Sequence, residues 1–206
     1  MTYTTVGDDT VASSFEVDGS EFIGHVSRAE TVDSAEEFVE TVEERHPDAT
    51  HNVSAYRVDP NDPVREKYDD DGEPSGSAGK PVLNVLQKED LRNVVAVVTR
   101  YYGGTKLGYG GLVRAYTKAV KDSLEKADTV DEKPRQTAVV EVGYDDLGDV
   151  NSVLDSSGFD SDYEAEYAET VTFEVRVPVE STEELYDRLR SATSGRVKIE
   201  VRSGSR

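Results

Sequence analysis

One stretch, Arg100–Tyr116, constrains the fold more than any other part of this 206-residue chain. A run of mostly β-branched residues, Val94–Thr99, comes directly before it and predicts a buried strand. An apolar periodicity that starts near Leu112 predicts an amphipathic helix after it. The glycines between the two can adopt positive φ and let another molecule approach the backbone. These glycines are Gly103, Gly104, Gly108, Gly110 and Gly111.

The charge of this region differs from that of the rest of the chain. The protein carries 43 acidic and 23 basic residues, for a net charge of −20. Residues 91–121 contain no acid and six bases: Arg92, Arg100, Lys106, Arg114, Lys118 and Lys121. Residues 74–121 have a net charge of +6, against −26 for the remainder. A basic segment inside an acidic protein indicates an anionic partner.

A second glycine loop lies at residues 69–81, with the sequence DDDGEPSGSAGKP. Pro81 suits the first turn of a short helix near Pro81–Gln87, so the amides of Gly79 and its neighbours are expected to point outward as an anion nest. The hypothesis is that both loops line one basic cleft. The predicted anion- and nucleic-acid-binding residues are Ser75, Gly76, Ser77, Gly79, Lys80, Arg100, Tyr101, Gly103, Gly104, Lys106, Gly110, Gly111, Arg114 and Lys118.

The remaining patterns predict an α+β protein of two domains, at residues 13–128 and 137–203. Asp18-Gly19 predicts a hairpin between strands, a capping box at Ser34–Glu37 predicts a helix, and residues up to about Ala12 are expected to be frayed. Further strands are expected at 49–58 and 64–68, with a turn at 59–63. Asp128–Thr137 has no periodicity and is expected to be the linker.

The second domain is predicted to be a ferredoxin-like sandwich, because its patterns follow a βαββαβ order. The expected elements are strands 138–144, 159–166, 169–179 and 196–202 and helices 146–156 and 182–192. A capping box, Ser181–Glu184, is expected to open the second of these helices.

Composition excludes several classes of site. The chain has no cysteine, which excludes disulfides and thiolate metal ligands. No secretory signal or long apolar run is visible, so we expect a cytoplasmic protein without membrane contact. The acidic, lysine-poor composition predicts adaptation to high salt, as in a halophilic archaeon.

No cofactor or metal is predicted. His25, His46 and His51 would bind a metal only if the fold gathered them, and His25 and His51 are expected on neighbouring strands.

Four motifs make the chain resemble the IMPACT family, specifically its two-domain, YigZ-like branch. The motifs are Phe22–His25, Ala49–Asn52 with Ala55–Arg57, Asp71–Pro81 and Arg100–Tyr116. The resemblance covers residues 14–127 and implies a first domain with the β-α-β fold of the second domain of a small-subunit ribosomal protein. It implies a second domain like the last domain of elongation factor G. Eukaryotic relatives regulate translation, so it also implies a role in translation.

These patterns favour a regulatory protein that binds RNA, a ribosomal surface or a translation factor. The cations would neutralise phosphates, the glycine amides would bond to oxygens, and Tyr101 or Tyr109 would stack on a base. The alternative is a hydrolase or phosphotransferase-like enzyme acting on a phosphorylated or carboxylate small molecule, with Asp71, Glu73 and Ser77 as candidates for chemistry. A third possibility is a protein-binding regulator without an anion site.

Overall fold

The computed structural model describes residues 2–58, 64–156 and 162–202. The chain divides into two compact units, Thr2–Glu132 and a unit that begins at Lys133. The predicted α+β class with two domains is confirmed. Within the described residues, no helix has the length and apolar content needed to cross a membrane.

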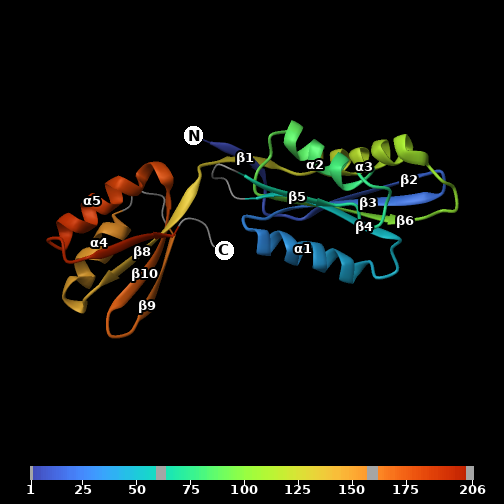
Figure 1. Ribbon diagram of the computed structural model, residues 1–206. Coiled ribbons are helices and arrows are strands. Elements are labelled where there is room, and N and C mark those ends of the chain that lie inside the picture. The colour runs from blue at the N-terminus through green and yellow to red at the C-terminus, as the bar shows by residue number, and fades with distance from the viewer. Residues whose placement is uncertain (1, 59–63, 157–161, 203–206) are drawn as a thin grey trace. The chain divides into compact units, whose positions relative to one another are not determined.

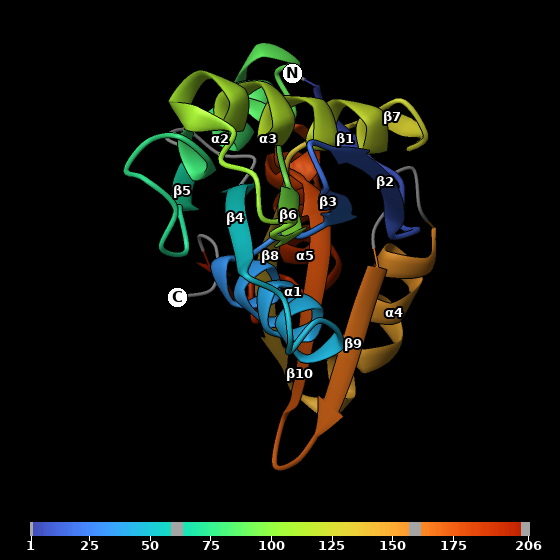
Figure 2. The same ribbon diagram turned by 90° about the vertical axis from the view of Figure 1, so that its right-hand side faces the viewer.

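The first unit is built on an antiparallel sheet with strand order β2-β3-β6-β4-β5. Its strands are β2 (Val11–Val17), β3 (Ser20–Arg28), β4 (His51–Val58), β5 (Arg65–Asp69) and β6 (Val94–Tyr101). Helix α1 (Val32–Arg45) covers one face, and α2 (Gly79–Lys88) and α3 (Gly108–Leu124) lie side by side on the other (Figures 1 and 2).

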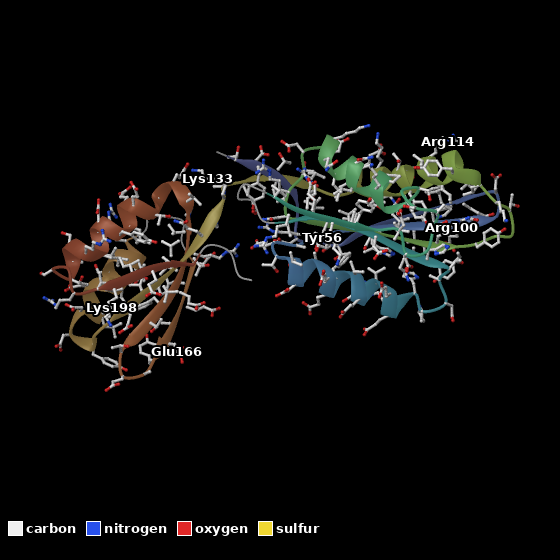
Figure 3. All side chains as sticks on the ribbon, viewed as in Figure 1. Tyr56, Arg100, Arg114, Lys133, Glu166 and Lys198 are labelled. Carbon is white, nitrogen blue, oxygen red and sulfur yellow. The ribbon has the colours of Figure 1, made fainter. Side chains whose placement is uncertain are left out.

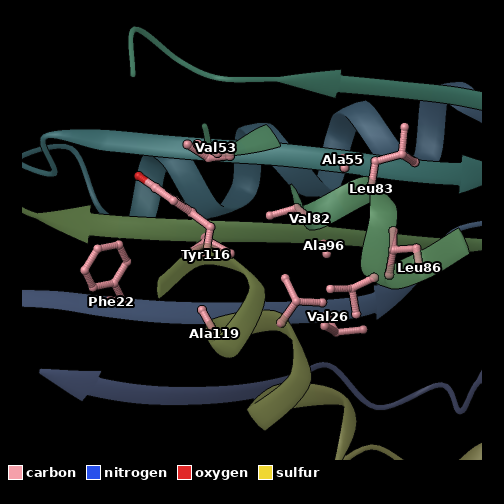
Figure 4. Close-up of a cluster of buried hydrophobic side chains, with 14 of the residues drawn as sticks. Phe22, Val26, Val53, Ala55, Val82, Leu83, Leu86, Ala96, Tyr116 and Ala119 are labelled. Atoms are coloured by element: carbon pink, nitrogen blue, oxygen red, sulfur yellow. The ribbon is translucent and has the colours of Figure 1, made fainter. Parts of the chain in front are cut away.

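The central strand β6 is buried on both faces, as its β-branched run predicted. Residues 94–98 are each 0% exposed. Alternate side chains enter two cores. Val94, Ala96 and Val98 pack beneath α2 and α3 with Phe22 and Tyr116 (Figure 4). Val95 packs beneath α1 in a smaller cluster.

The sequence predicted the position of the hairpin turn correctly, but it placed the starts of two helices several residues too late. Asp18 and Gly19 have φ of 49° and 77°, as a two-residue hairpin turn with two positive φ angles requires. The predicted capping box of α1 is wrong by one turn, because Thr31 caps the helix and Ser34 is its reciprocal partner. Helix α3 begins at Gly108, four residues before the expected start. The predicted turn at 59–63 lies outside the described residues.

The expectation of a frayed N-terminus is wrong. Strand β1 (Tyr3–Val6) pairs antiparallel with β7 (Thr129–Glu132), and the Tyr3 hydroxyl donates to Glu132 at 2.9 Å. The two strands are far apart in the sequence, so no local pattern indicated that they pair. Strand β7 and the start of β8 (Arg135–Val142) together occupy seven of the ten residues 128–137 that were predicted as linker.

The second unit has the predicted βαββαβ order. Its antiparallel sheet runs β11-β8-β10-β9, and α4 and α5 pack on one face of it, with Leu154 of α4 and Leu185 of α5 in the same core as Phe173 of β10. Two short 3₁₀ turns, Tyr144–Asp146 and Val179–Ser181, precede the helices. The elements are β8 (Arg135–Val142), α4 (Leu147–Asp155), β9 (Asp162–Tyr167), β10 (Val171–Pro178), α5 (Thr182–Ala192) and β11 (Lys198–Arg202). The predicted capping box at Ser181 is wrong, because its side chain makes no capping bond.

Candidate functional site

The two glycine loops meet above the end of the first sheet. The Tyr109 hydroxyl, in the first turn of α3, donates to the carbonyl oxygen of Gly76 at 3.1 Å. Arg100, at the end of β6, reaches Glu73 in the other loop. Loop 69–81 is therefore attached both to the sheet and to the start of α3.

The anion nest expected at Gly79 is filled by a carboxylate of the chain itself. Asp70 Oδ2 accepts from the amide of Gly76 at 2.7 Å, and Oδ1 accepts from Ala78 at 3.1 Å and Gly79 at 2.8 Å. A Cβ on Gly79 would lie 2.5 Å from the carbonyl oxygen of Asp69, so this glycine allows close packing of the loop. The nest exists, but it is not open to an external anion.

Arg100 is inside the protein rather than on the predicted binding surface. Its residue exposure is 5%, and Nη1 donates to Glu73 Oε1 at 2.5 Å. Its guanidinium carbon lies 5.4 Å from the ring centroids of Phe22 and Tyr102. Arg100 was predicted to neutralise a phosphate; the structure places it in a buried ion pair instead.

The acidic candidates for chemistry have structural partners. Glu73 also accepts from the Tyr116 hydroxyl at 2.8 Å, and burial together with this carboxylate raises the pKa of Tyr116. The Asp71 carboxylate accepts from the backbone amide of Asn52 at 2.6 Å. The backbone carbonyl of Asp71 accepts from His51 Nδ1, also at 2.6 Å. His51 Nε2 lies 3.9 Å from Glu73.

Ser77 does not face solvent. It is 0% exposed, and its hydroxyl has no hydrogen-bond partner within the described ranges. It therefore cannot contact an external ligand in this arrangement, although it was among the predicted binding residues.

Tyr101 lies on the opposite face of the sheet from α3. Side chains alternate along β6, so Tyr101 points toward α1, where its hydroxyl is 2.9 Å from His46 Nδ1. Its neighbour Tyr102 is 44% exposed, and Tyr109 is 59% exposed. Tyr102 was missed from the sequence, yet extending the strand alternation by three residues past Thr99 would have distinguished it from Tyr101.

An exposed basic surface remains on the side of α2 and α3. We call it the α2–α3 basic face; it consists of Lys80, Lys106, Arg114, Lys118 and Lys121. Arg114 projects from the outer side of α3, whereas Arg100 lies at the level of the sheet (Figure 3). Lys118 pairs with Asp122, the first residue after the acid-free stretch, and its Nζ lies 4.8 Å from the centroid of the Phe15 ring.

The N-terminus of α3 adds partial positive charge to this face. No side chain caps the helix, and its first turn contains no acid. Unpaired amides and the helix dipole together favour an anion at such an end. Of the predicted residues, Ser75, Lys80, Gly103, Gly104, Lys106, Gly110, Arg114 and Lys118 are exposed, and Gly76 and Gly111 are half-buried.

The histidines do not form a metal site in the part of the chain that is described, which holds no group of three or more potential ligands. Strand β6 separates His25 on β3 from His51 on β4, so the expectation of neighbouring strands is wrong. The ring centroids of His25 and His46 lie 5.2 Å apart, beneath α1.

Comparison with known proteins agrees with the motifs. Residues 18–124 match the model of the Impact N-terminal domain, and residues 140–196 match a domain of unknown function, DUF1949. The chain is 41% identical over 183 residues to the IMPACT family member YvyE of Bacillus subtilis, covering 89% of this chain and 83% of YvyE. The chain belongs to the IMPACT family.

Other members of the IMPACT family extend the comparison. The Escherichia coli member YigZ is 34% identical over 188 residues, covering 89% of this chain and 90% of YigZ. A crystal structure of a hypothetical protein matches with 30% identity and a TM-score of 0.77, covering 99% and 98% of the two chains. The Protein IMPACT-B of Xenopus tropicalis matches only 62 residues, 19% of its length, at 47% identity.

Proposed function

We propose that this protein is a cytoplasmic, translation-associated regulator that binds RNA, or a phosphate-rich surface of the ribosome or a translation factor, through the α2–α3 basic face. The link to translation comes from the family resemblance, which implies such a role, and part of this chain matches the Protein IMPACT-B of Xenopus tropicalis. The partner proposed here is identified by its phosphates, because this face carries five exposed cations, with the exposed tyrosines Tyr102 and Tyr109 nearby.

The observation that carries the proposal is the placement of the exposed cations. Lys80 on α2, Lys106 in the loop before α3, and Arg114 and Lys121 on α3 are all exposed, and both helices cover the same face of the sheet, in a chain whose net charge is −20. A surface that only needed to be soluble would share the acidity of the rest of the protein. Cations spaced along a helix and the loop before it suit a repeating phosphate backbone.

Two tyrosines give this face a way to hold bases. Tyr109 is fixed by its hydrogen bond to Gly76, so its exposed ring loses little freedom on binding. The Arg100 guanidinium lies over one face of the Tyr102 ring, with its carbon 5.4 Å from the ring centroid. Stacking of one base on an aromatic ring contributes about 1–3 kcal/mol and tolerates any base. We therefore expect affinity for single-stranded RNA with weak sequence preference.

The same geometry gives the enzyme alternative no support. Asp71 and Glu73 are held by backbone and side-chain donors, and the Ser77 hydroxyl is buried. Turnover would require these groups to leave their partners. The binding function requires no rearrangement of the described residues.

The test is RNA binding by a triple variant, Lys80→Ala with Lys106→Ala and Arg114→Ala. Binding is measured by fluorescence anisotropy at salt concentrations that increase from a low value. A single-stranded RNA of mixed sequence is the probe. Each lost phosphate contact should reduce the salt slope by about 0.7, so three losses should flatten it by about 2. Arg190→Ala, which removes an exposed cation from α5 in the second unit, is the matched control and should change nothing.

Two further variants separate stacking from charge. Tyr102→Leu and Tyr109→Leu should weaken binding by about tenfold each with an unchanged salt slope. Tyr102→Leu also removes a contact of Arg100, so its thermal stability must be measured alongside. Equal binding of RNA by wild type and triple variant would show that the basic face is structural, and would leave a protein-binding regulator as the better hypothesis.

A further inference from the structure

The second unit ends its sheet in an open edge at β9. The strand order is β11-β8-β10-β9, and within the described residues β9 pairs only with β10. Its sequence, DYEAEY, contains no proline, glycine or lysine that would block the addition of another strand. Because β9 pairs on one side only among the described residues, half of its backbone amides and carbonyls point away from the sheet, toward solvent.

One face of β9 carries tyrosines. Pairing places Tyr163 opposite Val175 and Tyr167 opposite Val171, on the same side as the buried core of this unit. The rings extend beyond that core: Tyr163 is 36% exposed and Tyr167 is 61% exposed. Tyr144 lies nearby, 53% exposed, and donates its hydroxyl proton to Ala168 at 2.9 Å. Exposed tyrosines of this kind are typical anchors of protein interfaces.

The other face of β9 carries carboxylates, namely Asp162, Glu164 and Glu166. Glu164 lies directly opposite Glu174 on β10, and like charges in such a pair are unfavourable, whereas Asp162 lies opposite Arg176. Glu164 and Glu166 make no ion pair with any described residue, and Asp162 lies 4.0 Å from Arg135. Glu166 is visible on this strand in Figure 3. Additional positive charge beside this face would relieve the repulsion.

We infer that β9 is a docking edge for an extended segment of a basic protein, in which lysine or arginine alternates with apolar residues. Added beside β9, such a segment places its bases next to Asp162, Glu164 and Glu166. Its apolar side chains then fall next to Tyr163 and Tyr167, because both strands alternate with a period of two. The backbone hydrogen bonds supply affinity and the alternation supplies selectivity.

The charges decide against two other occupants. A second copy of the chain, paired through the same strand, would set carboxylates against carboxylates. An RNA backbone would be repelled by the same three acids. The edge is thus distinct from the α2–α3 basic face, and the inference does not depend on the function proposed for that face.

The test uses the full-length protein and a fluorescein-labelled synthetic peptide in which arginine and valine alternate over about eight residues, the length of a common strand. We expect saturable binding by anisotropy and slower amide hydrogen exchange in residues 162–167 when the peptide is added. Glu164→Lys with Glu166→Lys should weaken binding by at least about tenfold, because two attractive contacts become repulsive. The matched control, Glu183→Lys with Asp187→Lys on α5, should leave binding within about twofold.

Two probes separate strand addition from general charge attraction. A peptide of the same composition with the arginines in one block, and an alternating peptide with methylated backbone nitrogens, should both bind at least about tenfold more weakly. Tyr167→Ala should weaken binding of the alternating peptide as well. Should the charge reversal fail to fold, Glu164→Gln with Glu166→Gln keeps the shape and should still reduce affinity. Equal binding of the blocked peptide, unchanged exchange in β9, or self-association of the wild type through β9 would each overturn the inference.

Discussion

Arg100 and Glu73 form an ion pair between a strand end and a loop, with a 2.5 Å bond from Nη1 to Oε1 and side chains that are 6% and 4% exposed. Tyr116 of α3 donates to the same carboxylate oxygen. Strand β6, loop 69–81 and helix α3 are thus joined at one carboxylate. This arrangement makes Glu73 important for stability rather than for chemistry.

Removing Glu73 should leave Arg100 as a buried charge without its partner. We expect Glu73→Ala to lower the free energy of unfolding by about 3–5 kcal/mol. Denaturant unfolding followed by circular dichroism measures this. Replacing both partners, Arg100→Met with Glu73→Leu, should recover a large part of the loss, because no charge is then buried. A loss below about 1 kcal/mol for Glu73→Ala would mean that water already solvates Arg100.

Asp70 should hold loop 69–81 closed and keep external anions out. Asp70→Ala removes the carboxylate that accepts hydrogen bonds from three backbone amides. We therefore expect faster amide hydrogen exchange at Gly76, Ala78 and Gly79, and a free energy of unfolding lower by about 2–4 kcal/mol. The vacated nest should then accept an anion.

Sulfate provides the readout for this second effect. At constant ionic strength, sulfate in place of chloride should raise the melting temperature of Asp70→Ala more than that of the wild type. Asp48→Ala, which removes an exposed acid elsewhere in the first unit, controls for the change in net charge. If sulfate stabilises all three proteins equally, the amides do not form a nest once Asp70 is absent.

The sequence predicted the elements and the family better than the site. The buried strand at 94–98 and the Asp18-Gly19 turn follow from local rules, since β-branched runs favour strands and a two-residue turn needs positive φ. The pairing of β1 with β7 depends on residues about 125 positions apart, which no local pattern contains. The glycines at 108–111 suggested a loop, but packing of α3 on the sheet overrides their weak helix propensity.

The site was harder to predict because charge alone does not show where a side chain points. Arg100 and Arg114 are equally basic in the sequence, but strand alternation turns Arg100 into the protein and helical spacing turns Arg114 outward. The loop glycines suggested an open nest, and only the three-dimensional position of Asp70 shows that it is occupied. Which face of β9 carries charge could be deduced from its alternation, whereas its edge position required the strand order.

His25 should make the first unit less stable in mild acid. Burial, with smaller contributions from His46 and Arg45, lowers the pKa of His25 from 6.5 to about 4. The unfolded chain therefore binds a proton at a higher pH than the folded one, and stability falls as the pH drops from about 6.5 toward 4. The loss should reach about 2 kcal/mol at pH 5 and about 3 kcal/mol below pH 4.

His25→Gln isolates this contribution, because glutamine does not titrate. The variant should lose less stability than the wild type between pH 7 and pH 5, by about 2 kcal/mol, when both are unfolded by denaturant at each pH. Paired carboxylates respond to acid in both proteins and cancel in the difference. Identical pH profiles would show that His25 gains solvent or a hydrogen-bond partner when protonated.

Salt should stabilise the protein through a particular cluster of acids as well as through its overall charge. Glu40, Glu43, Asp69 and Asp71 line one hollow of about 250 Å³ beside α1 and β4, together with Glu36, which is paired with Lys67 at 2.9 Å. Burial, with Asp71, Glu40 and Asp69 adding to it, raises the pKa of Glu43. Repulsion among these carboxylates weakens as salt is added, since the screening length falls to about 3 Å at 1 M.

We therefore expect the melting temperature of the wild type to rise from low to molar KCl, as the acidic composition predicted. Glu43→Gln should raise it at low salt and change it little at molar salt, because screening has by then removed the repulsion that the substitution relieves. Glu37→Gln is the matched control: it removes the same charge from an exposed position of α1 that does not line the hollow, so its effect should be smaller at every salt concentration. A wild-type melting temperature that stays flat with KCl, or equal effects of the two substitutions, would contradict a screened acidic cluster and would place the cause of the acidity outside stability in salt.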